Sequence, residues 1–247
     1  MSTSARETIL AAIRTALTDA PTGATPGAAP GAANGGGDGD ATDPSTGTPA
    51  VTFGDEPPIA RDYLAAHVST GLVDLLAENL ADYRAHVHRT SPAELPGVIA
   101  RLLAEHGSTG VAVPNDLPEE WLTTARAAGV AVTTDTPPLS PEALDRTDSV
   151  ITGCALAIAE TGTIVLDAGP GQGRRVLTLI PDHHICVIRC PEQVVASVPE
   201  AMPKLDPVRP QTWIAGPSAT SDIELDRVEG VHGPRRLEAV LVVSESD

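Results

Sequence analysis

Short, unbroken aliphatic runs alternate with amphipathic segments from residue 61 onward, and this alternation limits the fold more than any other feature. Unbroken aliphatic runs of strand length indicate strands that are buried on both faces of a parallel sheet. Parallel strands need helices as crossover connections. We therefore predict an α/β protein, a three-layer α/β/α sandwich with a mostly parallel sheet. The expected strands are GVAVP (110–114), VAVTT (130–134), SVITG (149–153), TIVLD (163–167), HICVI (184–188), TWIAG (212–216) and LEAVLVV (237–243).

Helices are predicted between these runs from their periodicity and their caps. The first reads GLVDLLAENLADYRAHVHRT (71–90), with leucines and Tyr83 along one face. Gly107 closes the second helix, and Ser140 caps a later, short one. The further helices expected are PGVIARLLAEHG (96–107), PEEWLTTARAAG (118–129), SPEALDRT (140–147), CALAIAE (154–160) and PEQVVASVPEAM (191–202).

The N-terminal part of the chain differs from the rest in composition. Residues 1–18 contain a short amphipathic helix over 4–17 that begins with a capping box. Residues 19–60 are rich in Gly, Pro, Ala and Thr, which predicts a flexible linker and leaves 61–247 as the α/β domain. The tethered helix either folds back on its own domain or contacts a partner chain, and the sequence leaves both interpretations open.

The charge balance excludes several classes of partner. The 33 acidic residues outnumber the 16 basic residues and give a formal net charge of −17. This charge repels nucleic acid phosphates and anionic lipid surfaces. No apolar run approaches the roughly 20 residues that a membrane helix requires, and no signal segment is recognisable. We therefore expect a cytoplasmic protein that binds no nucleic acid and has no membrane span.

The cysteines do not have the spacing of a cofactor site. Cys154, Cys186 and Cys190 are an odd number and include no CxxC pair. As strand residues, Cys186 and Cys190 would lie roughly 13 Å apart on one face, too far to chelate one metal by themselves. We expect reduced thiols, no metal site and no iron-sulfur cluster bound by this chain.

Ligands of open α/β sheets bind outside the carboxyl ends of the strands, and this rule directs attention to three loops. The first follows SVITG and contains Glu160, Thr161, Gly162 and Thr163, a polar turn in which the glycine lets the backbone approach a ligand. Glu160 is the candidate catalytic residue. Its carboxylate could serve as acid, base or nucleophile, or it could only cap and orient the turn.

The second loop is DAGPGQGRRVLTLIPDHH (167–184). Its GxGxG spacing, with no Lys-Ser/Thr after it, matches neither nucleotide-binding fingerprint. Arg174 and Arg175 could hold a carboxylate through a bidentate fork, or the loop could be a flexible connection. His183 and His184 open the next strand, so their side chains point to opposite faces and at most one faces a site.

The third loop is GPSATSDIELDRVEGVHGP (216–234), which follows TWIAG. Ser221 forms a capping box with Glu224, and capping by itself accounts for both residues. Acidic residues weaken the field of the helix N-terminus, so we expect this loop to prefer hydroxyls, amides or a cation to a bare phosphate. The candidate ligand-binding residues of this loop are Gly216, Pro217, Ser218, Thr220, Asp222, Glu224 and His232.

Three stretches, ITGCALAIAETGTIVLD, IPDHHICVI and GPSATSDIELDRVEGVHGPRRLEAVLV, resemble the lactate utilization protein C family, which carries a LUD domain. The resemblance covers about residues 61–243. It implies a fold like that of ribose-phosphate isomerases and CoA transferases, and a role as one of three proteins that oxidise L-lactate to pyruvate. In that system the other two subunits carry the iron-sulfur clusters, so the resemblance implies iron-sulfur partner subunits.

Two hypotheses of different classes follow. In the first, the chain is a non-redox subunit of a lactate-oxidising system and binds a small carboxylate or a partner surface through the three loops. In the second, the domain is an enzyme in its own right that resembles CoA transferases, with Glu160 as the nucleophile that attacks a thioester.

Overall fold

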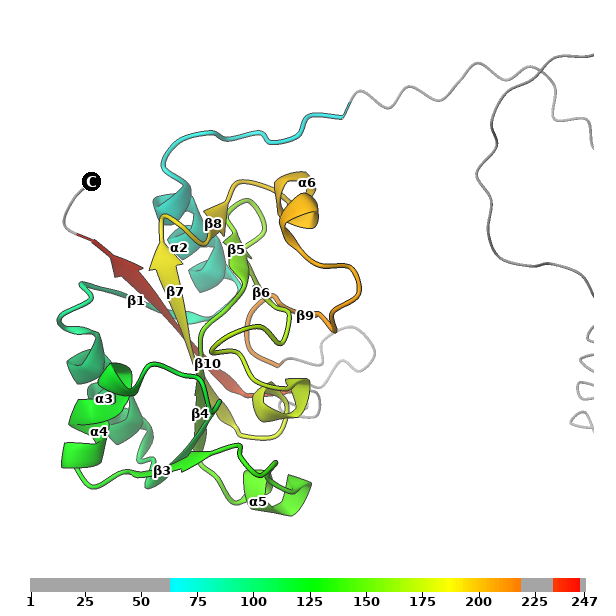
Figure 1. The fold of residues 1–247 in the computed structure, drawn as a ribbon. Coiled ribbons are helices and arrows are strands. Elements are labelled where there is room, and N and C mark those ends of the chain that lie inside the picture. The colour runs from blue at the N-terminus through cyan, green and yellow to red at the C-terminus, as the bar shows by residue number, and fades with distance from the viewer. Residues whose placement is uncertain (1–62, 219–232, 245–247) are drawn as a thin grey trace, which may run out of the picture. The chain divides into compact units, whose positions relative to one another are not determined.

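The computed structural model describes residues 63–218 and 233–244, and the strands of these residues form two sheets (Figure 1). The larger sheet contains β1 (His86–Thr90), β2 (Gly110–Val113), β3 (Ala131–Thr134), β4 (Ser149–Thr152), β7 (His183–Cys190) and β10 (Arg236–Val243). The smaller sheet contains β5 (Leu156–Ile158), β6 (Thr163–Leu166), β8 (Val194–Val195) and β9 (Thr212–Ile214). The six strands of the larger sheet have the order β1-β10-β7-β4-β2-β3, and all their pairings are parallel. The four strands of the smaller sheet have the order β8-β5-β6-β9.

Helices connect the parallel strands, so the α/β prediction is confirmed. They are α2 (Leu72–Asp82), α3 (Leu95–His106), α4 (Thr123–Ala127), α5 (Pro141–Asp145) and α6 (Val198–Ala201), with the 3-10 turns η1 (Glu119–Leu122), η2 (Arg175–Thr178) and η3 (Met202–Lys204). Gly107 ends α3 in the left-handed conformation and the Ser140 hydroxyl caps α5, both as the sequence predicts. Within the described ranges, no helix is long and apolar enough to cross a membrane.

The two longest strands of the larger sheet, β7 and β10, are neighbours and are buried on both faces. On one face Ile185, Val187 and Val240 pack against α3 in a single apolar cluster. On the other face Cys186 and Leu241 pack against α2 and against strands of the smaller sheet. Because successive side chains of a strand point to opposite faces, both faces can be buried only if nearly every residue is apolar. This explains the unbroken aliphatic runs of the sequence.

Three segments that the sequence predicts as helix are strands. Residues 86–90 form β1 instead of continuing α2, because the chain turns back at Arg84, whose φ is 69°, and then pairs with β10. CALAIAE forms β5 instead of a helix. The start of PEQVVASVPEAM forms β8, and only its end is the short helix α6. The runs in β5 and β8 are short, apolar and fully buried, and such a run fits either periodicity, so only its neighbours decide between helix and strand.

TIVLD and TWIAG do not join the parallel sheet. They form β6 and β9, which pair antiparallel with each other in the smaller sheet. No local pattern separates these runs from the strands of the larger sheet, because the partner strand determines the direction of pairing. The predicted helix over 4–17 and the predicted linker over 19–60 lie outside the described residues.

A buried carboxylate lies beside the start of β10. Glu238 is fully buried, and His88 Nε2 and Arg236 Nε lie 2.6 Å and 2.5 Å from its two oxygens. His183 Nε2 is 3.7 Å from Oε1. Burial opposes ionisation of this carboxyl, but the two imidazoles and the guanidinium more than offset it and hold the pKa of Glu238 well below its usual range. Removing one partner of a charged pair in such a site leaves the charge of the other partner uncompensated.

We predict that Glu238→Gln lowers the free energy of unfolding by about 2 to 3 kcal/mol at pH 7, less than for a fully enclosed pair because Arg236 is partly exposed. Since the folded pKa of Glu238 is depressed, its contribution is complete above the unfolded pKa of about 4.3 and is lost as pH falls toward the folded pKa. Urea unfolding at pH 7 and near pH 3.5 measures the free energy of unfolding at each pH. The difference in this free energy between wild type and Glu238→Gln should be smaller at the lower pH.

Glu78→Gln is the matched control, because Glu78 lies on the exposed side of α2. We expect this change to alter the free energy of unfolding by less than about 0.5 kcal/mol at either pH. Equal effects of the two substitutions at pH 7 would contradict the prediction.

Candidate functional site

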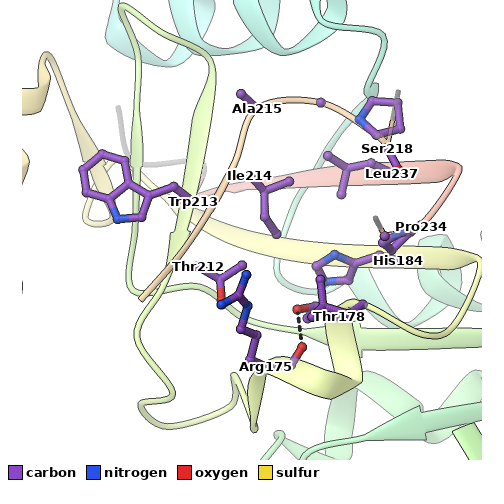
Figure 2. A pocket seen from close by; sticks show the side chains of 14 residues that line it. Arg175, Thr178, His184, Thr212, Trp213, Ile214, Ala215, Ser218, Pro234 and Leu237 are labelled. Carbon is purple, nitrogen blue, oxygen red and sulfur yellow. Dashed lines mark hydrogen bonds between the residues drawn. The ribbon is translucent and has the colours of Figure 1, made fainter. Parts of the chain in front are cut away.

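A cavity of about 200 Å³ lies between the two sheets, at the starts of β7 and β10 (Figure 2). His184 and Leu237 form its floor on the larger sheet, and Arg175, Thr178 and Leu179 border it from η2 and the residue after it. The remaining lining residues come from β9 and from the segments that flank residues 219–232: Thr212, Trp213, Ile214, Ala215, Gly216, Pro217, Ser218, Gly233 and Pro234. The cavity is large enough for a ligand of a few heavy atoms and too small for a nucleotide.

The cavity lies at the amino ends of the parallel strands, not at the carboxyl ends that the general rule favours. The crevice that the rule points to, between the carboxyl ends of β2 and β4, is occupied by the glycine-rich loop 167–174. The Gly153 amide after β4 donates to the Gly171 carbonyl at 2.7 Å, and Gly173 packs on Pro114 after β2. The chain itself therefore fills the expected ligand site.

Side chains within the glycine-rich loop hold it in place. The Asp167 amide donates to Gln172 Oε1 at 2.6 Å, and the Gly169 amide donates to Asp167 Oδ1 at 3.0 Å. Arg209 Nη1 donates to Asp167 Oδ2 at 3.2 Å. The loop is thus an ordered structural element, and its amides at Asp167 and Gly169 are already used by side chains of the same loop.

His184 is the buried imidazole of the cavity. It is 1% exposed, and its Nε2 lies 2.8 Å from Thr152 Oγ1 on β4. Burial, with a smaller contribution from His183, lowers the pKa of His184 to about 3. The ring is therefore neutral at physiological pH, and it can accept one hydrogen bond and donate another without carrying charge.

Arg175 supplies the charge of the cavity. Its side chain extends from η2 toward Thr212 (Figure 2), and its own carbonyl accepts from the Thr178 hydroxyl at 3.1 Å. Among residues 63–218 and 233–244, no carboxylate lies within ion-pair distance of its guanidinium. No other charged side chain is among the described residues that line the cavity. A single unpaired guanidinium favours a monoanion.

Arg174, one residue earlier, has a structural role. Its Nε and Nη2 donate to the two oxygens of Asp135 at 2.6 Å and 2.8 Å, and Nη2 also donates to the Leu139 carbonyl at 2.5 Å. Burial opposes ionisation of Asp135, but the bond from Arg174 and the Leu139 amide hold the pKa of this carboxyl below its usual range. Of the two neighbouring arginines, one fixes the loop and the other faces the cavity.

The strand β9 presents one side to the cavity. Figure 2 shows Ile214 directed toward His184 and Leu237, whereas Trp213 projects from the opposite side of β9. After this strand, the Ser218 amide donates to the Pro234 carbonyl at 2.8 Å. This bond joins the two ends that flank residues 219–232, and it places Ser218 at the rim of the cavity.

Four of the residues predicted for the site meet at this cavity: His184, Gly216, Pro217 and Ser218. His183 points to the other face of the larger sheet, where its ring stacks on His106 at 4.1 Å and its Nδ1 lies 2.8 Å from Ser149 Oγ. The remaining candidates of the third loop, Thr220, Asp222, Glu224 and His232, lie outside the described residues.

The turn from Glu160 to Thr163 is not part of the cavity lining. The Glu160 carboxylate accepts from the amides of His67 and Val68 at 2.5 Å and 3.3 Å. The bond from the His67 amide is the largest cause that lowers the pKa of Glu160. The Thr161 hydroxyl donates to the Thr163 hydroxyl at 2.8 Å. In this structure the carboxylate binds the amides of the segment that leads into α2.

Two glycines of the predicted site pack on one helix. A Cβ on Gly162, whose φ is 57°, would lie 2.7 Å from the carbonyl carbon of Asn79 in α2. A Cβ on Gly216, whose φ is 82°, would overlap the carbonyl oxygen of Tyr83, the residue that caps the same helix. Both positions therefore require glycine for space as well as for conformation. The first and third loops are brought together by α2, although only the third reaches the cavity.

Sequence reasoning gave too little weight to Arg175 and did not identify Thr152 or Thr178. Arg175 could not be separated from Arg174, because their roles depend on Asp135, which is distant in the chain. A signal for Thr152 was present, since it is a hydroxyl residue at the end of an otherwise aliphatic strand. Its partner His184 is contributed by the neighbouring strand, so the pair exists only in the folded sheet.

Comparison with known proteins identifies the domain. The sequence pattern of the LUD domain matches residues 73–242. The chain belongs to the LUD domain family. Lactate utilization protein C of Deinococcus radiodurans is 52% identical to it over 169 residues, which cover 67% of this chain and 76% of that protein. Lactate utilization protein C of Geobacillus kaustophilus is 28% identical over 204 residues, which cover 72% of this chain and 81% of that protein.

A solved structure supports the same fold for the LUD domain described above. The crystal structure of a DUF162 family protein from Deinococcus radiodurans matches with a TM-score of 0.58 and 44% sequence identity. The match covers 69% of this chain and 96% of that chain. The cavity lies within the region that the LUD domain pattern matches.

We predict different effects on stability for the two arginines. Arg174→Gln should lower the free energy of unfolding by about 1 to 3 kcal/mol, because it leaves the largely buried Asp135 carboxylate without its main partner. Arg175→Gln should change it by less than about 0.5 kcal/mol, because the side chain forms no ion pair with residues 63–218 and 233–244. Urea unfolding followed by circular dichroism measures both. Equal destabilisation would show that Arg175 also has a structural role.

Proposed function

We propose that this LUD domain protein is a non-redox subunit of a system that oxidises L-lactate to pyruvate, and that its cavity binds a small carboxylate. The main support is the identity of 52% with a protein named lactate utilization protein C, over most of the domain that forms the cavity. The one unpaired cation in the described lining, the guanidinium of Arg175, gives the proposed ligand its chemistry.

We assign the iron-sulfur clusters of this system to partner subunits. The three thiols of the chain, on Cys154, Cys186 and Cys190, are all buried. Burial raises the pKa of Cys190 to about 11, and a hydrogen bond with Cys186 together with burial raises the pKa of Cys154 well above its usual value. A cluster is ligated by thiolates, and these surroundings favour the protonated thiol. The three buried thiols thus support the assignment of the clusters to partner subunits, and the proposed role of this chain is to bind and orient a small molecule.

The size and charge of the cavity favour a monocarboxylate over larger or more highly charged anions. A space of about 200 Å³ admits an anion of the size of lactate or pyruvate. One guanidinium compensates one negative charge, whereas a dianion or a phosphate ester would bring a second, uncompensated charge next to the neutral His184 ring. Both Ser218 and Thr212 add hydroxyl groups at the border of the cavity.

A stand-alone CoA transferase with Glu160 as nucleophile is the alternative, and the geometry gives it less support. The Glu160 carboxylate accepts amide hydrogen bonds that stabilise its charge and reduce its nucleophilicity. It also lies outside the lining of the described cavity. A cytoplasmic location remains a prediction from the sequence.

We predict that deletion of the gene abolishes growth on L-lactate and that the wild-type gene restores it. Arg175→Gln should lower the rate of lactate oxidation by about tenfold or more, because a charge-assisted hydrogen bond to a carboxylate contributes about 1.5 to 3 kcal/mol. A gene that carries Glu160→Gln should also restore growth of the deletion strain, since the glutamine side chain has nearly the same shape as the glutamate side chain and fits the same turn. Growth curves and lactate consumption are the measurements, and immunoblots control for protein level.

Co-purification tests the proposed partners separately. The tagged full-length chain should bring down proteins whose absorption near 400 nm is lost on dithionite reduction, as for iron-sulfur subunits. Normal growth of the deletion strain on L-lactate would refute the proposed function. Loss of growth with Glu160→Gln at a normal protein level, combined with a covalent adduct on Glu160 after incubation with acyl-CoA, would favour the CoA transferase instead.

A further inference from the structure

We infer that Thr152 is a positioning residue of the cavity: it holds His184 in the tautomer that is protonated on Nε2, so that Nδ1 accepts a hydrogen bond from the hydroxyl of a bound 2-hydroxy monocarboxylate. This inference rests on the proposed carboxylate site and specifies its substrate class. It concerns how the site distinguishes a hydroxy acid from a simple carboxylate, and it assigns a role to a residue that lies behind the cavity and not in its lining.

The contact between Thr152 and His184 is fully buried and crosses two neighbouring strands. In the parallel pairing of β4 with β7, Thr152 is opposite Cys186, and His184 is two residues earlier on the same face. The distance of 2.8 Å between Thr152 Oγ1 and His184 Nε2 is that of a good hydrogen bond. Thr152 is 0% exposed, so no solvent molecule competes for this contact.

The direction of the bond follows from the other neighbours of the hydroxyl. Thr152 Oγ1 also donates toward Cys186 Sγ at 3.9 Å. When the single hydroxyl proton is directed to sulfur, the oxygen lone pairs accept from Nε2–H, and both protons have an acceptor. If the Thr152 hydroxyl instead donates to Nε2, the Cys186 sulfur receives no hydrogen bond from Thr152. The arrangement with the larger number of hydrogen bonds therefore leaves Nδ1 unprotonated.

Nδ1 is the ring nitrogen that remains for a ligand. Among the described residues it has no hydrogen-bond partner, and the ring lines the cavity together with Ile214 and Leu237. An unprotonated, neutral nitrogen accepts a proton from a hydroxyl but offers nothing to an oxo group, which has none to donate. With the carboxylate bound by Arg175, the hydroxyl on the adjacent carbon is the group that such an acceptor recognises.

The apolar lining around His184 increases the discrimination. Ile214 and Leu237 provide no donor, and the Thr178 hydroxyl already donates to the Arg175 carbonyl, so a ligand without a hydroxyl leaves Nδ1 without a partner from these neighbours. Sites that are built around a buried hydrogen bond reject analogues that lack the matching group more strongly than apolar sites reject small differences in size. We therefore expect L-lactate to bind about tenfold or more tightly than propionate, which is the same acid without the hydroxyl.

The first experiment reads the tautomer in the absence of ligand. The full-length protein is labelled with ¹⁵N-histidine, and the imidazole nitrogens are observed by long-range proton-nitrogen NMR, with the His184→Gln spectrum used for assignment. We expect His184 to show a protonated Nε2 and an unprotonated Nδ1 in wild type and in Thr152→Ser. Thr152→Val has nearly the same volume and no hydroxyl, and it should show a mixture of tautomers.

The second experiment measures binding of L-lactate, pyruvate and propionate by calorimetry to the same three proteins. In wild type and Thr152→Ser, L-lactate should bind about tenfold more tightly than the other two acids. In Thr152→Val this preference should disappear while propionate binding is retained, because Arg175 is unchanged. Circular dichroism and urea unfolding establish that each variant is folded. If Thr152→Val is unstable, the tautomer of wild-type His184 and the wild-type preference for L-lactate over propionate still test the recognition of the hydroxyl.

Each outcome decides one part of the inference. An unchanged tautomer and an unchanged preference for L-lactate in Thr152→Val would overturn the role of Thr152. A wild-type ring protonated on Nδ1, or equal binding of L-lactate and propionate to wild type, would overturn the proposed recognition of the hydroxyl. These results test how the cavity recognises its ligand, whereas growth of the deletion strain on L-lactate tests the proposed function separately.

Discussion

The pairing of β7 with β10 is the constraint on which the rest of the structure depends. These strands are aligned over their whole length and are buried on both faces, so every side chain at their starts is placed by the same register. His184 and Leu237 are paired on the face of the cavity, and His183 lies near Glu238 on the opposite face. Two adjacent histidines thus enter different environments: one becomes a neutral cavity residue and the other a member of a buried charged cluster.

The position of the cavity is a consequence of how the glycine-rich loop is used. In many doubly wound sheets the crevice at the carboxyl ends receives a ligand. Here loop 167–174 fills the space after β2 and β4 and is held there by Arg209 and Gln172. The same loop then leads directly into η2, which begins at Arg175, a residue of the cavity lining. One continuous segment thus fills the crevice after β2 and β4 and also supplies the charged residue of the cavity.

Several parts of the fold and the site could be predicted from the sequence, for identifiable reasons. The strands of the larger sheet other than β1 and the end of α3 follow from local signals, namely aliphatic runs and a glycine in the left-handed conformation. The segments that became β5 and β8 were misjudged because a short buried apolar run has no periodicity that separates helix from strand. The segment that became β1 is largely polar, and it was misjudged because its pairing with β10 is not a local signal. Glu160 was a reasonable candidate by residue type, yet its role as a cap depends on amides more than ninety residues earlier in the chain.

The sequence by itself determined the α/β class, the aliphatic core and the placement of His183 and His184 on opposite faces, because these follow from composition and from the two-residue period of a strand. Only the tertiary structure decided that β6 and β9 pair outside the parallel sheet and that Thr152 lies within hydrogen-bond distance of His184. It also decided that Arg174 pairs with Asp135, while Arg175 has no carboxylate partner in the part of the chain that the structure describes. The physical reason is the range of the interactions. Local conformation depends on neighbouring residues, whereas a cavity is formed by contacts between segments that only the complete fold brings together.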